Sequence, residues 1–82
     1  MIDVLYFAWV RERIGLPREQ VETNAATVRE LVAELIDREA RYAAAFADLT
    51  SLRVAVDQVL VDFDAPLKDA REIAFFPPMT GG

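Results

Sequence analysis

Only one stretch of the chain repeats its apolar residues with the period of a long helix, and strand-like segments lie on both sides of it. Thr27 is a good helix N-cap, and Glu30, three residues later, completes a capping box with it. The apolar residues that follow predict one buried helix face, made of Val28, Leu31, Val32, Leu35 and Ile36. The pattern therefore predicts one main helix over residues 28–40.

Other segments are rich in β-branched and aromatic residues, and we expect strands over residues 2–10, 18–23, 52–56, 59–61 and 72–76. Side chains alternate along a strand, so the even-numbered residues of the first strand lie on one face. The residues expected on the other face are Asp3, Leu5, Phe7 and Trp9. In the last strand, Ile73 and Phe75 are expected to point into the core. Strands before and after a helix that crosses one sheet face predict the α+β class, with the first and last strands parallel neighbours.

The connections between these segments are short. A break at residues 15–17 is expected to make a hairpin of the first two strands, with Gly15 at positive φ. Residues 41–49 are rich in alanine without a clear period, so we expect a helical turn or a loop that Tyr42 and Phe46 pack against the core. The glutamates expected on solvated faces are Glu19, Glu22, Glu30, Glu34 and Glu39.

A tight turn at Asp57 and Gln58 precedes the shortest predicted strand. With Val59 and Val61 in the core, Leu60 points away from it. In the turn-rich segment that follows, the expected core residues are Phe63 and Leu67.

Residue types that are absent limit the chemistry of the chain. Its 82 residues include no histidine and no cysteine, which excludes a triad base, a thiol nucleophile, a disulfide and a His- or Cys-based metal site. Nine Lys and Arg against 14 Asp and Glu give a net charge of −5, which disfavours nucleic acid as a partner. No apolar run approaches the roughly 20 residues that a bilayer requires, and we expect a cytoplasmic protein with no membrane partner. We do not expect an enzyme acting alone, and any chemistry is expected at a partner.

The chain ends in FFPPMTGG, directly after the last predicted strand. Pro77 and Pro78 remove two backbone donors and favour an extended exit from the sheet. Gly81 and Gly82 have no side chain, so a terminal carboxylate there can pass through a slot too narrow for any Cβ. A frayed end is the simpler interpretation of a Gly-Gly terminus, but the proline spacer and the strand before it favour a working tail.

Apolar residues also gather on the sheet face that the helix leaves free. The alternation of side chains along each strand places Phe7, Leu60 and Phe76 on that face, with Leu5 and Trp9 near them. Single exposed apolar residues are ordinary, whereas several on one face beside the origin of a tail predict a protein-binding patch.

Two further pairs of residues each have two open interpretations. Arg11 and Arg13 follow the first strand and are either rim residues of the patch or plain solvated charges. Met79 and Thr80 either line the channel that receives the tail or serve only as spacer.

The opening VLYFAWVRERIG, the segment VAVDQVLVDFDAPL and above all EIAFFPPMTGG resemble the small, sulfur-carrying subunit of molybdopterin synthase. The resemblance runs from Ile2 to Gly82, and the final strand with its PP-x-x-GG end is the most specific part. It implies the β-grasp (ubiquitin-like) fold, a mixed sheet with one main helix packed on one face. The β-grasp domain then covers residues 1–76, and the extended tail covers residues 77–82.

In that family, a partner enzyme uses ATP and magnesium to activate the carboxylate of the last glycine as an acyl-adenylate. Sulfur is then installed as a thiocarboxylate, and the tail enters the large subunit, where sulfur passes to cyclic pyranopterin monophosphate to form molybdopterin. The resemblance implies that Gly82 carries AMP and then sulfur, as 1-thioglycine, and that Gly81 is the spacer that lets it enter. The chain itself is then a non-catalytic, sulfur-donating subunit.

The same resemblance implies the partners of the chain. These are the large catalytic subunit, in a heterotetramer, the ATP-dependent adenylating enzyme and a sulfur donor protein. It implies no cofactor bound by the chain itself, apart from the AMP attached transiently at Gly82.

Two positions depart from the family pattern. Family members often have Asp-Gly before the last strand, where this chain has Asp69-Ala70, and a positive φ at Ala70 would strain its Cβ. They often have Asn where Asp57 stands, a change that the hairpin turn tolerates.

Three alternatives remain open at the level of the sequence. A sulfur carrier for another product, such as the thiamine thiazole ring, has the same fold and the same Gly-Gly end. A ubiquitin-like protein modifier would be joined through Gly82 to lysines of its targets. A binding module whose tail has no chemistry is the third.

Overall fold

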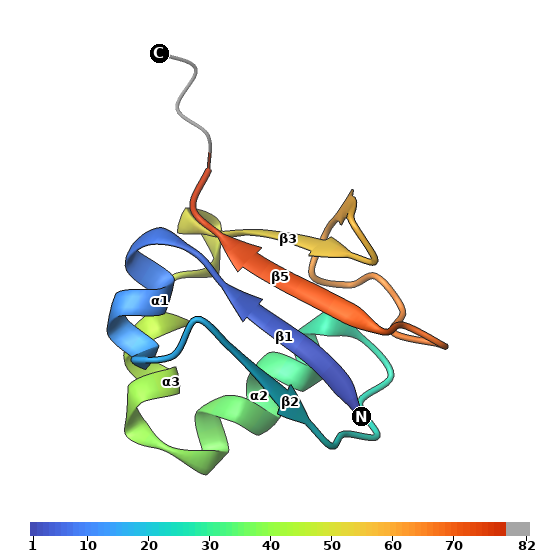
Figure 1. The fold of residues 1–82 in the computed structure, drawn as a ribbon, viewed down its shortest axis with the longest axis horizontal. Coiled ribbons are helices and arrows are strands. Elements are labelled where there is room, and N and C mark those ends of the chain that lie inside the picture. The colour runs from blue at the N-terminus through green and yellow to red at the C-terminus, as the bar shows by residue number, and fades with distance from the viewer. Residues whose placement is uncertain (79–82) are drawn as a thin grey trace.

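The computed structural model describes residues 1–78 of the chain. Figure 1 shows the elements in their order along the chain, which are β1 (Ile2–Tyr6), α1 (Ala8–Ile14), β2 (Arg18–Val21), α2 (Val28–Arg38), α3 (Ala40–Ala45), the 3₁₀ helix η1 (Leu49–Ser51), β3 (Arg53–Val56), β4 (Val59–Val61) and β5 (Glu72–Phe76).

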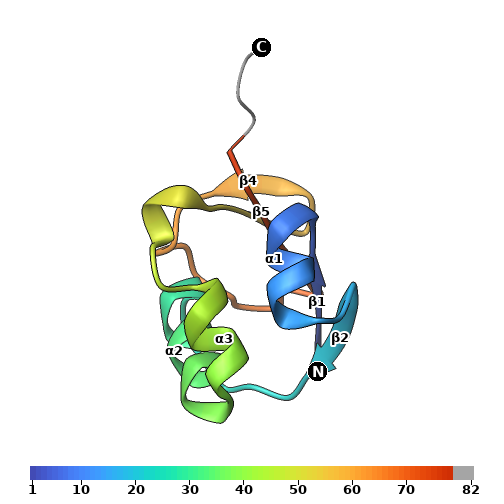
Figure 2. The same cartoon turned by 90° about the vertical axis from the view of Figure 1, so that its left-hand side faces the viewer.

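The strands form one mixed sheet in the order β2-β1-β5-β3-β4. The first and last strands are parallel neighbours, with Val4 paired with Ile73, and the other pairs of neighbouring strands are antiparallel. Figure 2 shows α2 and α3 together on one side of β1 and β2. The predicted α+β class and the predicted parallel pairing of the first and last strands are therefore confirmed, and the arrangement is that of a β-grasp fold.

The main helix begins and packs as its sequence predicts. The Thr27 hydroxyl accepts a hydrogen bond from the backbone N–H of Glu30 at 3.2 Å, and the helix then runs to Arg38. Its core-facing residues are Val28, Leu31, Val32 and Leu35. Ile36, predicted to belong to the same face, is 37% exposed, because it lies at the margin of the buried stripe.

The alanine-rich segment after the main helix is itself helical over Ala40–Ala45. Tyr42 and Phe46 are both buried, which confirms their expected role of packing this segment on the core. Phe46 meets Phe75 of the central strand edge-to-face, with ring centroids 4.9 Å apart. Leu67 is buried and Phe63 is half-buried against the core, also as expected.

The predicted first strand is wrong beyond Tyr6, because residues 8–14 form the helix α1. Val10 and Ile14 are both buried whereas Glu12 between them is exposed, which a helix allows and a strand, where all three would share one face, does not. Ala8, expected inward, is exposed and has a φ of 53°. The connection between β1 and β2 is therefore a helix and not a hairpin turn. Gly15 has the expected positive φ, but as the cap of this helix, where its N–H donates to the carbonyl of Arg11 at 2.7 Å.

The turn before β4 has the form that favours tight hairpins. Asp57 and Gln58 have φ values of 48° and 71°, the signature of a two-residue type I′ turn. The Asp57 carboxylate also accepts hydrogen bonds from the backbone N–H groups of Arg71 and Glu72, each at 3.0 Å, at the start of β5. Val59 is 62% exposed, so the expectation that it joins the core is wrong.

The turn before β5 avoids the strain expected at Ala70. The positive φ, 60°, falls on Asp69, a residue type that tolerates this conformation better than alanine. Among residues 1–78, no helix has both the length and the apolar character needed to cross a membrane.

Candidate functional site

The last strand leads directly to the tail. β5 lies in the middle of the sheet, between β1 and β3, and its residues Ile73 and Phe75 are completely buried. Because β1 and β5 are parallel neighbours, their carboxyl ends lie side by side. There the N–H of Phe7 donates a hydrogen bond to the carbonyl of Phe75 at 3.1 Å. The chain therefore leaves the sheet from a fixed, central position (Figure 1).

The predicted tail is described only at its start. Pro77 and Pro78 are half-buried and continue the chain beyond β5 without strand pairing. Met79, Thr80, Gly81 and Gly82 lie outside the described residues. The roles expected for these residues, with Gly82 as the sulfur-bearing group and Gly81 as its spacer, stay predictions.

A row of outward-facing residues crosses the sheet on the side opposite α2. Leu5 is paired with Ala74, Ala74 with Ala55, and Ala55 with Leu60. Neighbouring strands are about 4.8 Å apart, so this row is roughly 14 Å long. The surface is lower in the middle of the row than at its two ends, because the side chains of the two alanines are smaller than those of Leu5 and Leu60.

Phe7 and Phe76 lie on the same side, beside the origin of the tail. Phe7 has extended backbone angles (φ −123°, ψ 154°), so it continues the alternation of β1, and its side chain is 43% exposed. Phe76 is half-buried, and it faces away from the core because its neighbour Phe75 faces inward. The predicted placement of these two residues and of Leu60 away from the main helix is confirmed, with Leu60 66% exposed at the far edge of the sheet.

We call the outward-facing side of the sheet the docking face and define it by six residues, which are Leu5, Phe7, Ala55, Leu60, Ala74 and Phe76. Several apolar side chains on one exposed surface are typical of a protein-binding site. That the docking face binds a partner stays a prediction.

Arginines accompany the docking face. Arg53 is paired with Phe76 across β3 and β5, and Arg18 is paired with Leu5 across β2 and β1. Arg18 lies 3.8 Å from Asp3, whereas Arg53 and the exposed Arg11 have no ion pair within residues 1–78. Asp3 and Glu72 are paired on the same side of the sheet, so only the end of the docking face beside Arg53, where the tail begins, is suited to an acidic group of a partner.

Trp9 does not belong to the docking face, contrary to its predicted position near the patch. It lies in α1 and is half-buried against the core. The guanidinium of Arg13 stands over its ring, 4.6 Å from the centroid. This contact gives Arg13 a partner inside the chain, so Arg11 is the better candidate for the rim of a docking site.

A half-buried carboxylate, Glu19, joins two buried tyrosines in a hydrogen-bonded cluster that the sequence does not predict. The expectation that Glu19 lies on a solvated strand face is wrong, because its Oε2 accepts hydrogen bonds from the hydroxyls of Tyr6, at 2.7 Å, and Tyr42, at 2.5 Å. Burial, together with this carboxylate, raises the pKa of Tyr42 to about 12 and raises the pKa of Tyr6 well beyond its usual range. The alternation of β2 already points to this position, because residues two apart in a strand share a face and Glu19 lies two residues before the buried Val21.

The cluster has a structural role near the tail. It links α3, through Tyr42, to β2 and to the end of β1. The ring of Tyr6 lies parallel to that of Phe75, with centroids 6.3 Å apart, so the same cluster also supports the strand that leads to the tail. Within the part of the chain that the structure describes, no group of three or more carboxylate, His or Cys side chains is placed to hold a metal ion.

Comparisons with known proteins agree with this geometry. Residues 4–82 match the model of the family described as the ThiS family. The chain is 46% identical over 82 residues to the molybdopterin synthase sulfur carrier subunit of Escherichia coli, and the match covers all of both chains. The protein of the same name from Haemophilus influenzae is 39% identical over 82 residues, again over all of both chains.

Among solved structures, SAMP1 from Haloferax volcanii superposes with a TM-score of 0.77, covering 99% of this chain and 98% of that one. At 21% sequence identity, this likeness concerns the fold alone, and it confirms the β-grasp architecture. The sequence relatives carry the family assignment. The chain belongs to the ThiS family and, within it, to the molybdopterin synthase sulfur carrier subunits.

Proposed function

We propose that this chain is the sulfur carrier subunit of molybdopterin synthase and that the carboxylate of Gly82 is the group that carries the sulfur. The observation that carries this proposal is the full-length match to relatives of that name, which are 46% and 39% identical over all of both chains. The match to the family model also extends to residue 82.

The proposed cycle follows from the chemistry of a carboxylate, which is a poor acyl donor until it is activated. A partner enzyme with ATP and magnesium joins the Gly82 carboxylate to AMP with release of pyrophosphate, and sulfur at the oxidation level of sulfide, supplied by a donor protein, then displaces the AMP to leave a thiocarboxylate. In the large subunit, each thiocarboxylate delivers one sulfur to cyclic pyranopterin monophosphate and returns to a carboxylate by taking up the oxygen of water, so that two deliveries supply the two sulfurs of the dithiolene in molybdopterin. The chain has no histidine or cysteine, so the acid–base and nucleophilic steps fall to the partners.

We assign the docking face to the large subunit and to the activating enzyme. Phe7 and Phe76 lie beside the origin of the tail, so a partner that covers them also receives the tail. Arg11 contributes a cation at the rim, and residues 77–82 reach at most about 20 Å beyond the sheet. The proposal places the chain in the cytoplasm, where ATP for the activation is available.

Removal of the proposed reactive residue tests this function. The chain without Gly82 is incubated with the purified activating enzyme, ATP, a sulfur source and the large subunit, and conversion of the cyclic pterin is measured. We expect complete loss of conversion with an unchanged melting temperature, because residue 82 lies beyond the last strand. Lys68→Ala, at an exposed loop residue outside the tail and the docking face, is the control and is expected to keep most of the activity.

Full sulfur transfer by the truncated chain would contradict the proposal. The same samples distinguish the alternatives. A carrier for the thiazole ring would accept sulfur at Gly82 but would not convert the pterin, whereas a protein modifier would form higher-mass conjugates with other proteins.

A further inference from the structure

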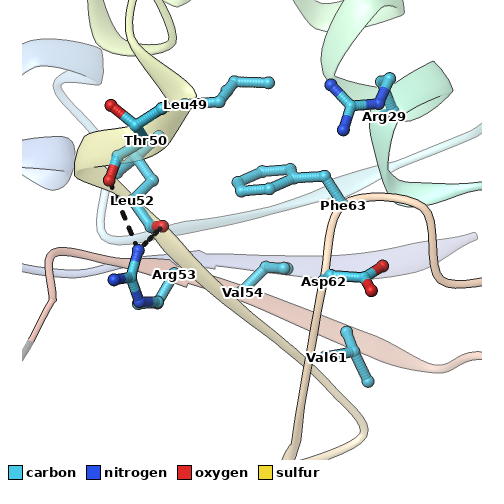
Figure 3. Close-up of a pocket in the computed structure, with 9 residues that line it drawn as sticks. All are labelled: Arg29, Leu49, Thr50, Leu52, Arg53, Val54, Val61, Asp62 and Phe63. Carbon is cyan, nitrogen blue, oxygen red and sulfur yellow. Dashed lines mark hydrogen bonds between the residues drawn. The ribbon is translucent and has the colours of Figure 1, made fainter.

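A second concave surface lies on the helix side of the sheet, between β3, the end of β4, η1 and the start of α2 (Figure 3). Its volume is about 450 Å³, within the range of sites that bind ligands or inserted side chains. The apolar part of its lining is made of Leu49, Leu52, Val54, Val61 and Phe63. We call this surface the β4 hollow.

The walls of the β4 hollow are held in place by the core. Val54 and Leu52 are buried, and the ring of Phe63 lies nearly parallel to that of Phe75, with centroids 6.4 Å apart. Leu49 and Val61 are only half-buried, so the hollow presents apolar surface that nothing within residues 1–78 covers fully. A preformed apolar hollow of this kind binds a side chain without the cost of ordering its own walls.

The sheet edge beside the hollow is open to pairing, unlike the opposite edge. β2, at one edge, has the sequence REQV, and its charged residues discourage the addition of another strand. β4, at the other edge, has the sequence VLV, with Val59 and Leu60 both mostly exposed. An uncharged, apolar edge strand is a typical place for an extended segment of another protein to pair.

The charges around the hollow indicate what such a segment carries. In Figure 3, Arg29 and Arg53 stand on opposite sides of the hollow. Arg29 is paired with Asp64 at 2.9 Å, and the carboxylate of Asp62, which also lines the hollow, lies on the same side as Arg29. The guanidinium of Arg53 donates hydrogen bonds to the carbonyls of Leu52 and Thr50, at 2.8 and 3.4 Å, and has no carboxylate partner within the described residues. An incoming carboxylate would complement this cation.

We propose that an extended segment of the large subunit lies along β4, inserts an apolar side chain into the β4 hollow and places a carboxylate beside Arg53. The inference rests on the proposed function in that it takes the large subunit as the partner. The hollow is continuous with the docking face, because Leu60 belongs to β4 and Arg53 is paired with Phe76. A stable subunit interface buries roughly 800 Å² on each partner, so we expect the large subunit to cover more of the chain than the row of four residues from Leu5 to Leu60.

Protection of single cysteines tests this inference, since the chain contains no cysteine of its own. Three full-length variants are compared: Val61→Cys in the hollow, Leu60→Cys on the docking face and Asp37→Cys on the exposed side of α2. The rate of alkylation by iodoacetamide is measured for the chain alone and with saturating purified large subunit. We expect the rate to fall at least about tenfold for Val61→Cys and Leu60→Cys and to stay within about twofold for Asp37→Cys.

The outcomes separate this inference from the proposed function. Protection of both Val61→Cys and Leu60→Cys supports the inference. Protection of Leu60→Cys alone overturns it and leaves the proposed docking face intact. Protection of neither residue overturns the inference together with the assignment of the docking face.

A charge reversal tests the predicted carboxylate. Arg53→Glu is expected to weaken binding of the large subunit at least about tenfold, whereas Lys68→Glu, an equal change of charge at an exposed loop residue, is expected to leave it unchanged. Equal affinity for the two variants overturns the pairing with Arg53. If Arg53→Glu lowers the melting temperature, its weaker binding has a structural cause, and the protection of Val61→Cys then decides whether the β4 hollow is occupied.

Discussion

The backbone N–H of Phe7 donates a hydrogen bond to the carbonyl oxygen of Phe75 at 3.1 Å, at the point where β1 gives way to α1 and β5 approaches its end. This bond extends the parallel pairing of the two strands by one residue. It holds the exposed side chain of Phe7 next to Phe76 and the start of the tail. The docking face and the start of the tail at Pro77 are therefore held together by the same pair of strands.

A charge placed on the docking face is expected to disrupt docking without unfolding the domain. Phe76→Asp removes an aromatic contact and buries a carboxylate in the interface, which we expect to weaken binding of the large subunit at least about tenfold. The measurement is titration calorimetry with the purified large subunit, together with thermal unfolding of the variant. Ile36→Asp, which places the same charge on an exposed apolar residue of α2, is expected to bind normally.

If Phe76→Asp fails to fold while Ile36→Asp folds, the outward placement of Phe76 is wrong. If both variants fold and bind alike, the docking face lies elsewhere on the molecule.

The main helix and the last strand could be predicted from the sequence because each depends on local information. The capping box at Thr27 and the apolar stripe after it specify a helix start and a buried face within one segment. In β5, the inward Ile73 and Phe75 alternate with the outward Glu72 and Ala74, and the prolines after Phe76 end the strand. The parallel pairing of β1 with β5 then follows from the crossing of the sheet by that helix.

The features that escaped prediction depend on competition between patterns or on distant partners. Residues 7–10 alternate as a strand does, and the four-residue spacing of Val10 and Ile14 fits a strand as well as a helix. Only the folded structure, where Glu12 between them is exposed, distinguishes the two. Glu19 was misplaced because its hydrogen-bond partners are 13 and 23 residues away. The β4 hollow was also missed, since it arises between η1, β3 and β4 and no single segment carries its pattern.

The Glu19 cluster is expected to contribute measurably to stability. Glu19→Leu leaves the buried hydroxyls of Tyr6 and Tyr42 without their acceptor, and we expect the free energy of unfolding to fall by about 1–3 kcal/mol. Gln20→Leu changes the neighbouring, exposed residue of β2 and is expected to cost less than about 0.5 kcal/mol. Urea unfolding of the two variants makes the comparison, and equal stabilities would show that the cluster contributes nothing.

Stability is expected to fall at alkaline pH because of Tyr42. Its pKa is raised in the folded state, from its ordinary value of 10.0 to about 12, so folding favours the neutral phenol. The stability from this group is therefore fully present below pH 10 and is lost as the pH rises through about 12. Urea unfolding across this range should show a weaker pH dependence for Tyr42→Phe than for the parent chain. An unchanged dependence would contradict this assignment.

The hairpin turn offers a stabilising substitution. Gln58 has a φ of 71°, a conformation that costs a residue with a Cβ roughly 1–2 kcal/mol and costs glycine little. Allowing for the greater freedom of glycine in the unfolded chain, we expect Gln58→Gly to raise the free energy of unfolding by about 0.5–1 kcal/mol. Ala55→Gly, inside β3, should lower the same quantity by a similar amount. A destabilised Gln58→Gly variant would mean that the side chain contributes more than the backbone strain costs.

The claim at the centre of this account is that the carboxylate of Gly82 carries sulfur, and the mass of the intact chain tests it most directly. The protein is isolated from its own host without chemical treatment, and its terminal fragment is analysed by mass spectrometry. We predict a population in which one oxygen of the Gly82 carboxylate is replaced by sulfur, and we predict that this population disappears when the large subunit and its pterin substrate are added. A chain that is trimmed before Gly82, permanently extended beyond it or never found with sulfur at that position would contradict the account.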